Sequence, residues 1–294
     1  VADGSPQEQA ERLAHHTDLV RLGLAGNLAD YAFLTADGQV RTGADLDYNG
    51  EPAGYAAQPA EIITYVDAPD NETLYDNLVF KLPTGTSMED RVRMNTLSLA
   101  TTALAQTPSF WHAGTDLLRS KSLDRNSYNS GDHFNRLDWT MTTNNFGVGL
   151  PMAADNADAW PVMGPLLANP DLVPAPANIE HSAALAQELL ELRFSTPLIR
   201  LGSAELIEAK VSFPESGPQA TPGLITMLID DTVGEPVDPD LDGALIVFNA
   251  SPVEIVEELG ELASREFELS PIQANGADDV VRATAWDAGS GTVT

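Results

Sequence analysis

The 294-residue sequence predicts an α/β fold followed by an all-β region. Residues 61–76, EIITYVDAPDNETLYD, have the pattern of a short buried strand (62–66), a turn with Asp67 and Asp70, and a helix that starts at Asn71. This order is one unit of a (β/α)8 barrel, whose chemistry lies where the strands end. In the last third of the chain, apolar residues alternate as they do in strands. A plain helix-capping role is the alternative for Asp70 or Asn71.

A helix and a long loop are predicted before this unit. Residues 5–8, SPQE, combine a capping serine, a proline at the first helical position and a glutamate that completes a capping box. Residues 23–26, GLAG, mark the end of that helix. Residues 31–59 are rich in Gly, Pro and Asp and are predicted to be a loop. Tyr48 and Tyr55 in this loop either stack on a ligand or pack the loop down.

More helices and one more buried strand are predicted after the unit. Residues 87–106 form a helix that its first serine caps. Residues 110–114, FWHAG, are predicted to be the last strand of the barrel, and residues 161–168 a short helix. Residues 178–196 form the final helix, which the proline that follows ends.

The stretch from Ser120 to Trp139 is polar, aromatic and rich in turn residues. It follows a predicted barrel strand directly, so it belongs at the mouth where barrel enzymes bind their ligands. Tyr128, Asp132 and Arg136 supply an aromatic face beside hydrogen-bonding groups, which a sugar site needs. The alternative is a structural loop in which the Asp and Arg side chains satisfy each other.

The period of the apolar residues changes after Leu198, and the pattern there is that of a β-sandwich. The predicted strands are 207–213, 223–229, 244–248, 267–269 and 281–285. Asp238, Asp240 and Asp242 open like a calcium loop, but its twelfth position holds Asn249 instead of Glu. A solvated turn is the favoured interpretation. No cofactor is expected to be required, and calcium remains the one open possibility.

Composition restricts the partners. The net charge is −29 and the sequence pI is about 4.1, so nucleic acid and anionic membrane surfaces are poor partners. No apolar run reaches about 18 residues, so no membrane span is expected. The absence of cysteine excludes disulfides and thiol catalysis. Strong acidity with only three lysines favours adaptation to high salt over an ordinary acidic secreted protein, and the opening VADGSPQEQ shows no signal peptide.

Several long segments resemble the pullulanase-type α-1,6-glucosidases of the α-amylase clan. The matching segments are DLVRLGLAGNLADY (18–31), YVDAPDNETLYD (65–76), HAGTDLLRSKSLDRNSYNSGDHFNRLDW (112–139) and NNFGVGLP (144–151). The resemblance implies that residues 1–197 are the C-terminal portion of the catalytic (β/α)8, or TIM, barrel. Residues 198–294 would then be the family's C-terminal β-sandwich domain without its last strand.

The resemblance also implies an activity and a set of residues. Members of this family hydrolyse α-1,6-glucosidic bonds in pullulan, starch (amylopectin) or glycogen with retention, so an α-glucan is the expected partner. Asp70 matches a carboxylate that stabilises the transition state, and Asp132 and Arg136 match a pair that grips the glucose next to the cleaved one. Asn71, Tyr128 and Asn135 lie in the same segments and are further substrate-binding candidates. A secreted or periplasmic bacterial location is favoured over the cytoplasm.

Three positions depart from the family pattern. Pro69 replaces a histidine that donates to the same sugar as Asp70, His133 replaces a tryptophan, and Ser109 stands in an altered strand entry. In addition, no segment resembles the strands that carry the nucleophile and the general acid. The chain alone is therefore expected to be inactive. The alternative is a catalytically inactive fragment or carbohydrate-binding remnant of the family.

Overall fold

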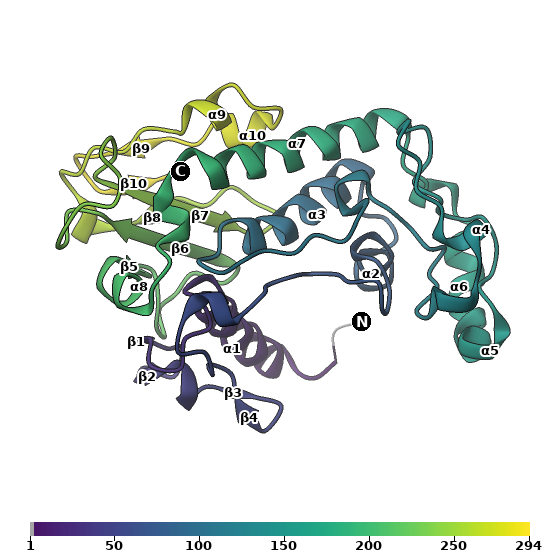
Figure 1. Ribbon diagram of the computed structural model, residues 1–294, viewed down its shortest axis with the longest axis horizontal. Coiled ribbons are helices and arrows are strands. Elements are labelled where there is room, and N and C mark those ends of the chain that lie inside the picture. The colour runs from purple at the N-terminus through teal and green to yellow at the C-terminus, as the bar shows by residue number, and fades with distance from the viewer. Residues whose placement is uncertain (1–2) are drawn as a thin grey trace. The chain divides into compact units, whose positions relative to one another are not determined.

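The computed structural model describes residues 3–294 and divides into two compact units. The first unit holds the chain up to Thr64, Thr101–Ser109 and Leu189–Thr294, and the second holds Tyr65–Ala100 and Phe110–Glu188. Figure 1 shows the elements of both. Among residues 3–294, no helix has the length and apolar character needed to cross a membrane.

The first unit begins with helix α1 (Pro6–Leu24), whose predicted capping box is confirmed. The Ser5 hydroxyl accepts from the Glu8 N–H at 3.3 Å, and the Glu8 carboxylate accepts from the Ser5 N–H at 2.6 Å. Two small hairpins follow where a loop was expected: β1 (Ala32–Leu34) with β2 (Val40–Thr42), and β3 (Asp47–Tyr48) with β4 (Glu51–Pro52). The 3₁₀ turns η1 (Gly43–Asp45) and η2 (Pro59–Glu61) complete this region.

Two three-stranded antiparallel sheets form the C-terminal part of the first unit (Figure 1). One has the order β5-β6-β7 and is built from Val211–Ser212, Leu224–Asp230 and Gly243–Asn249. The other has the order β8-β10-β9 and is built from Glu257–Glu258, Thr292–Val293 and Trp286–Asp287. The strands predicted at 223–229 and 244–248 are confirmed. The remaining elements are η7 (Pro197–Arg200), α8 (Ala204–Lys210), η8 (Gly260–Leu262), α9 (Pro271–Ala274) and α10 (Asp279–Arg282).

Of the other three strand predictions in this part, one is right only at its end and two are wrong. Only Val211–Ser212 of the predicted strand 207–213 form a strand, β5. Residues 207–210 are helical because Ser203 caps α8 by accepting from the Leu206 N–H at 3.3 Å, and the sequence AELIEAK favours a helix. Asp278 starts α10 in the same way, so residues 281–285 form no strand. Residues 267–269 stay irregular, and the Phe267 ring packs edge-on against Trp286 with centroids 5.1 Å apart.

The second unit is largely helical. Its elements are α2 (Leu74–Lys81), η3 (Thr115–Leu117), η4 (Ser127–Asn129), α4 (Asp132–Asn135), α5 (Ala153–Asn156), η5 (Ala157–Ala159), α6 (Trp160–Leu167) and η6 (Pro170–Leu172). Helices α3 (Met88–Ala103) and α7 (Pro176–Ser195) contain the points of division between the units. The predicted helices at 87–106, 161–168 and 178–196 are thus confirmed with shifted ends. The core of the second unit includes Tyr75, Val92, Leu118, Leu123 and Met163, all at most 2% exposed.

The two predicted barrel strands are absent as regular strands. The segment 62–66 makes a single parallel bridge, between Thr64 and Ser109, with the Thr64 N–H donating to the Pro108 carbonyl at 3.0 Å. Ile62 is buried, but Ile63 and Tyr65 are 61% and 59% exposed, so the segment is only partly buried, and residues 110–114 form no ladder. A barrel strand requires a neighbour on each side. In residues 3–294 this segment has one neighbour, over one residue.

Candidate functional site

The acidic turn, residues 67–71, lies in the second unit just before α2. Helix α2 starts at Leu74 instead of Asn71, and its cap is Thr73, whose hydroxyl accepts from the Asp76 N–H at 3.2 Å. Buried Asp67 accepts from the Leu74 N–H at 3.1 Å and lies 3.6 Å from His112 Nδ1. The capping role considered for Asp70 and Asn71 is therefore wrong, because Thr73 and Asp67 fill it.

Asp70 is exposed, and its carboxylate makes no hydrogen bond or ion pair with any residue that the structure describes. Asn71 follows with φ at 61°, in the left-handed region that asparagine tolerates better than most residues. The turn therefore presents a free carboxylate to solvent.

A buried lysine, which no sequence motif indicates, contacts this turn. Lys121 is 1% exposed, and its Nζ donates to the Pro69 carbonyl at 2.9 Å and to the Asn71 carbonyl at 2.6 Å. Burial lowers the pKa of this amine. The only sequence signal for it is that lysine occurs three times in the whole chain, once in the Ser120–Trp139 stretch.

Asp76, in the first turn of α2, holds the start of the polar loop (residues 120–139). It is fully buried, and its carboxylate accepts from the Ser120 hydroxyl at 2.5 Å and from the Lys121 N–H at 2.8 Å. Burial raises the pKa of Asp76 to about 6, against the opposing effect of these hydrogen bonds. This contact connects the acidic turn and its helix to the polar loop.

Two side chains inside the polar loop hold its shape. Buried Asp124 accepts from the Asn126 N–H and the Asn156 amide, both at 3.0 Å, and from the Ser130 hydroxyl at 2.6 Å. The Asn135 amide donates to the Ser127 carbonyl at 2.8 Å and accepts from the Ser127 hydroxyl at 2.8 Å. Asn135 was a substrate-binding candidate, but its side chain is occupied within the loop.

Other predicted binding residues of the loop are free. Asp132 begins α4 and Arg136 follows its end, and both are exposed. Neither forms a hydrogen bond or ion pair within residues 3–294, so the two do not satisfy each other. Tyr128 is 92% exposed. His133 shares a hydrogen bond of 2.9 Å with the Val148 carbonyl.

Arg119, like Lys121, supports the structure around the site and was not indicated by any sequence motif. Its guanidinium donates to the Ala113 carbonyl at 3.0 Å and to the Asn135 carbonyl at 2.9 Å, and lies 3.1 Å from His112 Nε2. Partial burial lowers its pKa. Arg119 thus joins the HAG segment to α4, the helix between Asp132 and Arg136.

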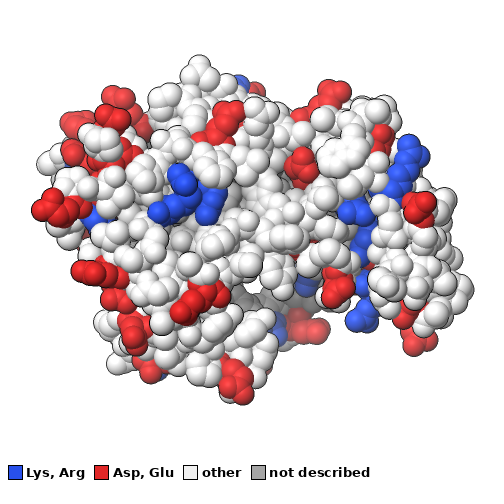
Figure 2. Space-filling view, in the orientation of Figure 1, with Lys and Arg blue, Asp and Glu red and all other residues white. Residues whose placement is uncertain are grey.

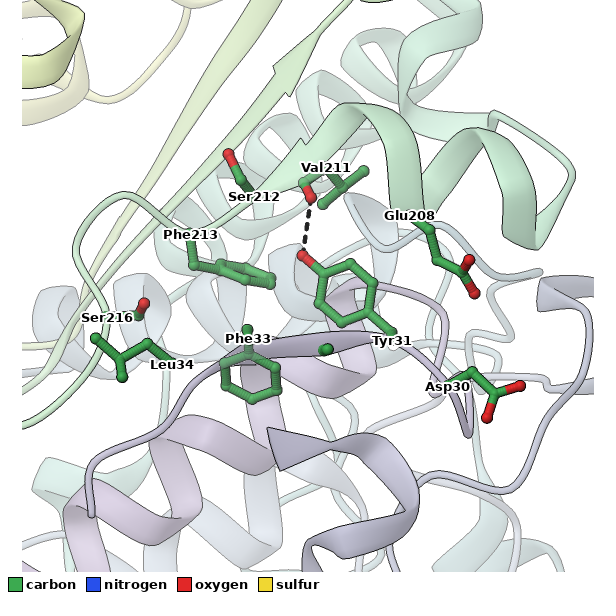
Figure 3. A pocket seen from close by; sticks show the side chains of 10 residues that line it. Asp30, Tyr31, Phe33, Leu34, Glu208, Val211, Ser212, Phe213 and Ser216 are labelled. Carbon is green, nitrogen blue, oxygen red and sulfur yellow. Dashed lines mark hydrogen bonds between the residues drawn. The ribbon is translucent and has the colours of Figure 1, made fainter. Parts of the chain in front are cut away.

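A groove of about 490 Å³ in the first unit is a different kind of feature (Figure 3). The rings of Tyr31, Phe33 and Phe213 lie in its wall with centroids 5.9–6.2 Å apart, and the Tyr31 hydroxyl donates to the Val211 carbonyl at 2.9 Å. These rings are only 3–7% exposed, so they pack on one another and offer no free face for stacking. Tyr48 and Tyr55, by contrast, are 59% and 69% exposed.

Neither the surface charge nor the possible metal ligands mark a binding position in residues 3–294. Acidic side chains are dispersed over the face seen in Figure 2, where they do not form one patch. Within residues 3–294, no group of three or more His, Asp or Glu side chains is arranged to hold a metal ion. In the segment considered for calcium, Asp238 accepts from the Thr196 hydroxyl at 2.5 Å and from the Asp240 N–H at 2.9 Å, as in a hydrogen-bonded turn.

Comparison with known proteins gives consistent matches. A family model described as "Alpha-1,6-glucosidases, pullulanase-type, C-terminal" matches residues 141–294. The chain is 39% identical to pullulanase 1, chloroplastic, of Arabidopsis thaliana over 99% of this chain and 31% of that protein. It is also 39% identical to a Klebsiella pneumoniae pullulanase, over 97% of this chain and 26% of that protein. The chain thus spans about a quarter to a third of the length of these curated relatives.

Solved structures agree with these matches. The maltotriose complex of PulA from Klebsiella pneumoniae superposes with a TM-score of 0.90 at 37% identity, over 97% of this chain and 30% of that one. PulA from Klebsiella oxytoca gives a TM-score of 0.90 at 38% identity, over 99% of this chain and 27% of that one. The fold of this chain is therefore that of the matched region of these pullulanases.

Proposed function

Because the chain belongs to the pullulanase-type α-1,6-glucosidase family and matches the model of its C-terminal region, we propose that it serves in the retaining hydrolysis of α-1,6 bonds in pullulan, starch or glycogen. Residues 1–197 would complete a catalytic (β/α)8 barrel, and residues 198–294 would form the β-sandwich domain. The two three-stranded sheets after residue 210 support the second assignment. The free carboxylate of Asp70, on a turn fixed at both ends, is the observation that carries the proposal.

Asp70 is proposed to stabilise the transition state. Glycoside hydrolysis passes through an oxocarbenium-like state, in which positive charge develops on the sugar. A carboxylate without an internal partner keeps its full charge available for that state, and a position fixed in advance avoids reorganisation during the reaction. Asn71, next to it on the exposed turn, is a proposed contact to the same sugar.

Asp132 and Arg136 are proposed to grip a neighbouring glucose, with Tyr128 as an aromatic neighbour. Their side chains combine an acceptor and a rigid donor fork, and both are exposed and unpaired in the described part of the chain. The internal hydrogen bonds of Asp124 and Asn135 support this proposal, because they fix the loop without using the two charged groups. Asn135 would act through the loop shape and would not contact the sugar.

The nucleophile and the general acid are proposed to lie outside these 294 residues, so the chain alone would not cleave glucan. A second candidate function is that of a non-catalytic carbohydrate-binding remnant. Pro69 favours it, because proline offers no side-chain donor where the family pattern has histidine.

A chimera tests the proposal. In it, this chain replaces the region that it matches in the Klebsiella pneumoniae pullulanase, and reducing-sugar release from pullulan is measured at high salt to screen the net charge of −29. Activity in the chimera but not in the chain alone would support the proposal. An inactive chimera that still binds maltotriose would favour the remnant, and activity of the chain alone would refute the placement of the nucleophile and acid.

A further inference from the structure

We propose that Lys121 is a positioning residue for Asp70, because its ammonium group clamps the two main-chain carbonyls on either side of that aspartate. This inference rests on the proposed function of Asp70. The distances from Nζ are 2.9 Å to Pro69 O and 2.6 Å to Asn71 O. Two of the three ammonium hydrogens are thus used on one three-residue turn.

The main chain at Lys121 is itself held in place by Asp76 of α2. The Lys121 N–H donates to Asp76 at 2.8 Å, and the preceding Ser120 hydroxyl donates to the other oxygen of the same carboxylate at 2.5 Å. Asp76 belongs to α2, which starts three residues after the turn. The contacts therefore run from α2 through Lys121 back to the turn, and they leave Asp70 little freedom to move relative to the helix.

The free-energy cost of burying the Lys121 ammonium group indicates that this residue does more than fill space. A buried cation is costly unless it is compensated. Among residues 3–294 Lys121 forms no direct ion pair. The nearby carboxylates of Asp76, Asp124 and Glu72 favour its charged form but do not outweigh the effect of burial on its pKa. A methionine of similar volume would fill the same space without that cost. The neutral acceptors that the lysine does have are both in the turn that carries Asp70. Placement of that turn is therefore the gain that we infer for the burial of this charge, beyond the attraction of the nearby carboxylates.

The clamp also explains how the turn tolerates Pro69. Proline lacks an N–H but keeps its carbonyl oxygen, and the lysine contacts main-chain oxygens only. The change from histidine to proline therefore removes a side-chain donor toward the sugar without removing the support of Asp70. Support of the carboxylate and donation to the sugar are separate functions in this turn.

Kinetics of the chimera test the inference. Lys121→Met should lower kcat by about a hundredfold while KM for pullulan changes little, because a misplaced catalytic group affects the transition state more than binding. Lys121→Arg, which keeps the cation with a different donor geometry, should lose less. Lys81→Met, at an exposed lysine of α2, is the matched control and should leave kcat unchanged. Equal kcat in folded Lys121→Met and unsubstituted chimera would overturn the inference.

A second measurement does not depend on activity. Hydrogen exchange of the full chain should become faster in residues 68–73 of the Lys121→Met variant and stay unchanged in α6. If the chimera is inactive, the proposed function fails, and this exchange result alone decides whether Lys121 holds the turn. Unchanged exchange in residues 68–73 would overturn the inference. Loss of helical circular dichroism in both Lys121 variants would also overturn it, in favour of a role in folding alone.

Discussion

The Ser120 hydroxyl and the Asp76 carboxylate meet at 2.5 Å in the interior of the second unit, and neither residue is exposed to solvent. Ser120 belongs to the polar loop, which carries Asp132. Asp76 belongs to α2, the helix that follows the turn with Asp70. A carboxylate that holds such segments together is under two opposing influences. Burial favours its neutral form, whereas the donated hydrogen bonds favour its charged form.

Asp76 should make stability depend on pH. Burial raises its pKa from the ordinary 3.8 to about 6. The folded state then holds the proton more tightly than the unfolded state, so this contribution is present in full below about pH 4 and is lost as pH rises to about 6. The shift corresponds to about 3 kcal/mol. The free energy of unfolding of the unsubstituted chain and of Asp76→Asn should be measured with urea at high salt. As pH rises from about 4 to about 6, the unsubstituted chain should lose stability relative to Asp76→Asn. A difference that does not vary with pH would contradict the assignment.

Asn135→Ala should destabilise the chain. The Asn135 amide bonds to Ser127 and Gly131 within the polar loop, and the loss of these hydrogen bonds should lower the free energy of unfolding by about 2 kcal/mol. Asn126→Ala, at an exposed position of the same loop, is the control and should change stability little. Weaker maltotriose binding at unchanged stability would show instead that Asn135 contacts the sugar.

Arg136→Ala should weaken binding without affecting the fold. The guanidinium is exposed and unpaired in the described residues, so its removal costs no internal contact. Maltotriose affinity, measured by titration calorimetry, should fall about tenfold or more, and Arg136→Lys should recover only part of it, because an ammonium group lacks the planar fork. Arg125→Ala is the matched control in the same loop. Equal affinity in wild type and Arg136→Ala would remove Arg136 from the site.

Pro69→His should increase catalysis by the chimera. Histidine restores a donor toward the sugar, and donors of this kind contribute about a hundredfold to kcat. The Lys121 contact to the carbonyl of residue 69 should survive the change. The gain has two candidate causes, the added imidazole donor and the removal of the proline ring from the turn. Pro69→Ala removes the ring without adding a donor, so a gain of equal size in that variant would show that the imidazole is not responsible.

The sequence predicted elements whose cause is local and missed those whose cause is distant. The capping box at Ser5 and Glu8 and the long apolar runs of β6 and β7 depend on neighbouring residues, and these elements are confirmed. The segment 62–66 has the composition of a buried strand, but a strand also requires partners that sequence alone does not locate. The alternation around Ile207 was misleading because the Ser203 cap and good helix formers dominate there.

The same distinction applies to the site. The resemblance identified Asp70, Asp132 and Arg136, and the structure leaves their side chains free within the described residues. Lys121 was not identified, because its role depends on carbonyls that are 50 and 52 residues away in the chain. Main-chain oxygens leave no trace in side-chain motifs, so only the folded chain reveals this contact.

The role proposed for Asp70 is tested most sharply by the kcat of the chimera with Asp70→Asn. The amide keeps the size of the side chain but removes the negative charge that is proposed to stabilise the transition state. We expect kcat for pullulan to fall by about a hundredfold or more, as for loss of a preorganised electrostatic group, while maltotriose affinity changes little. An unchanged kcat, or a loss confined to KM, would contradict the claim that Asp70 acts at the transition state.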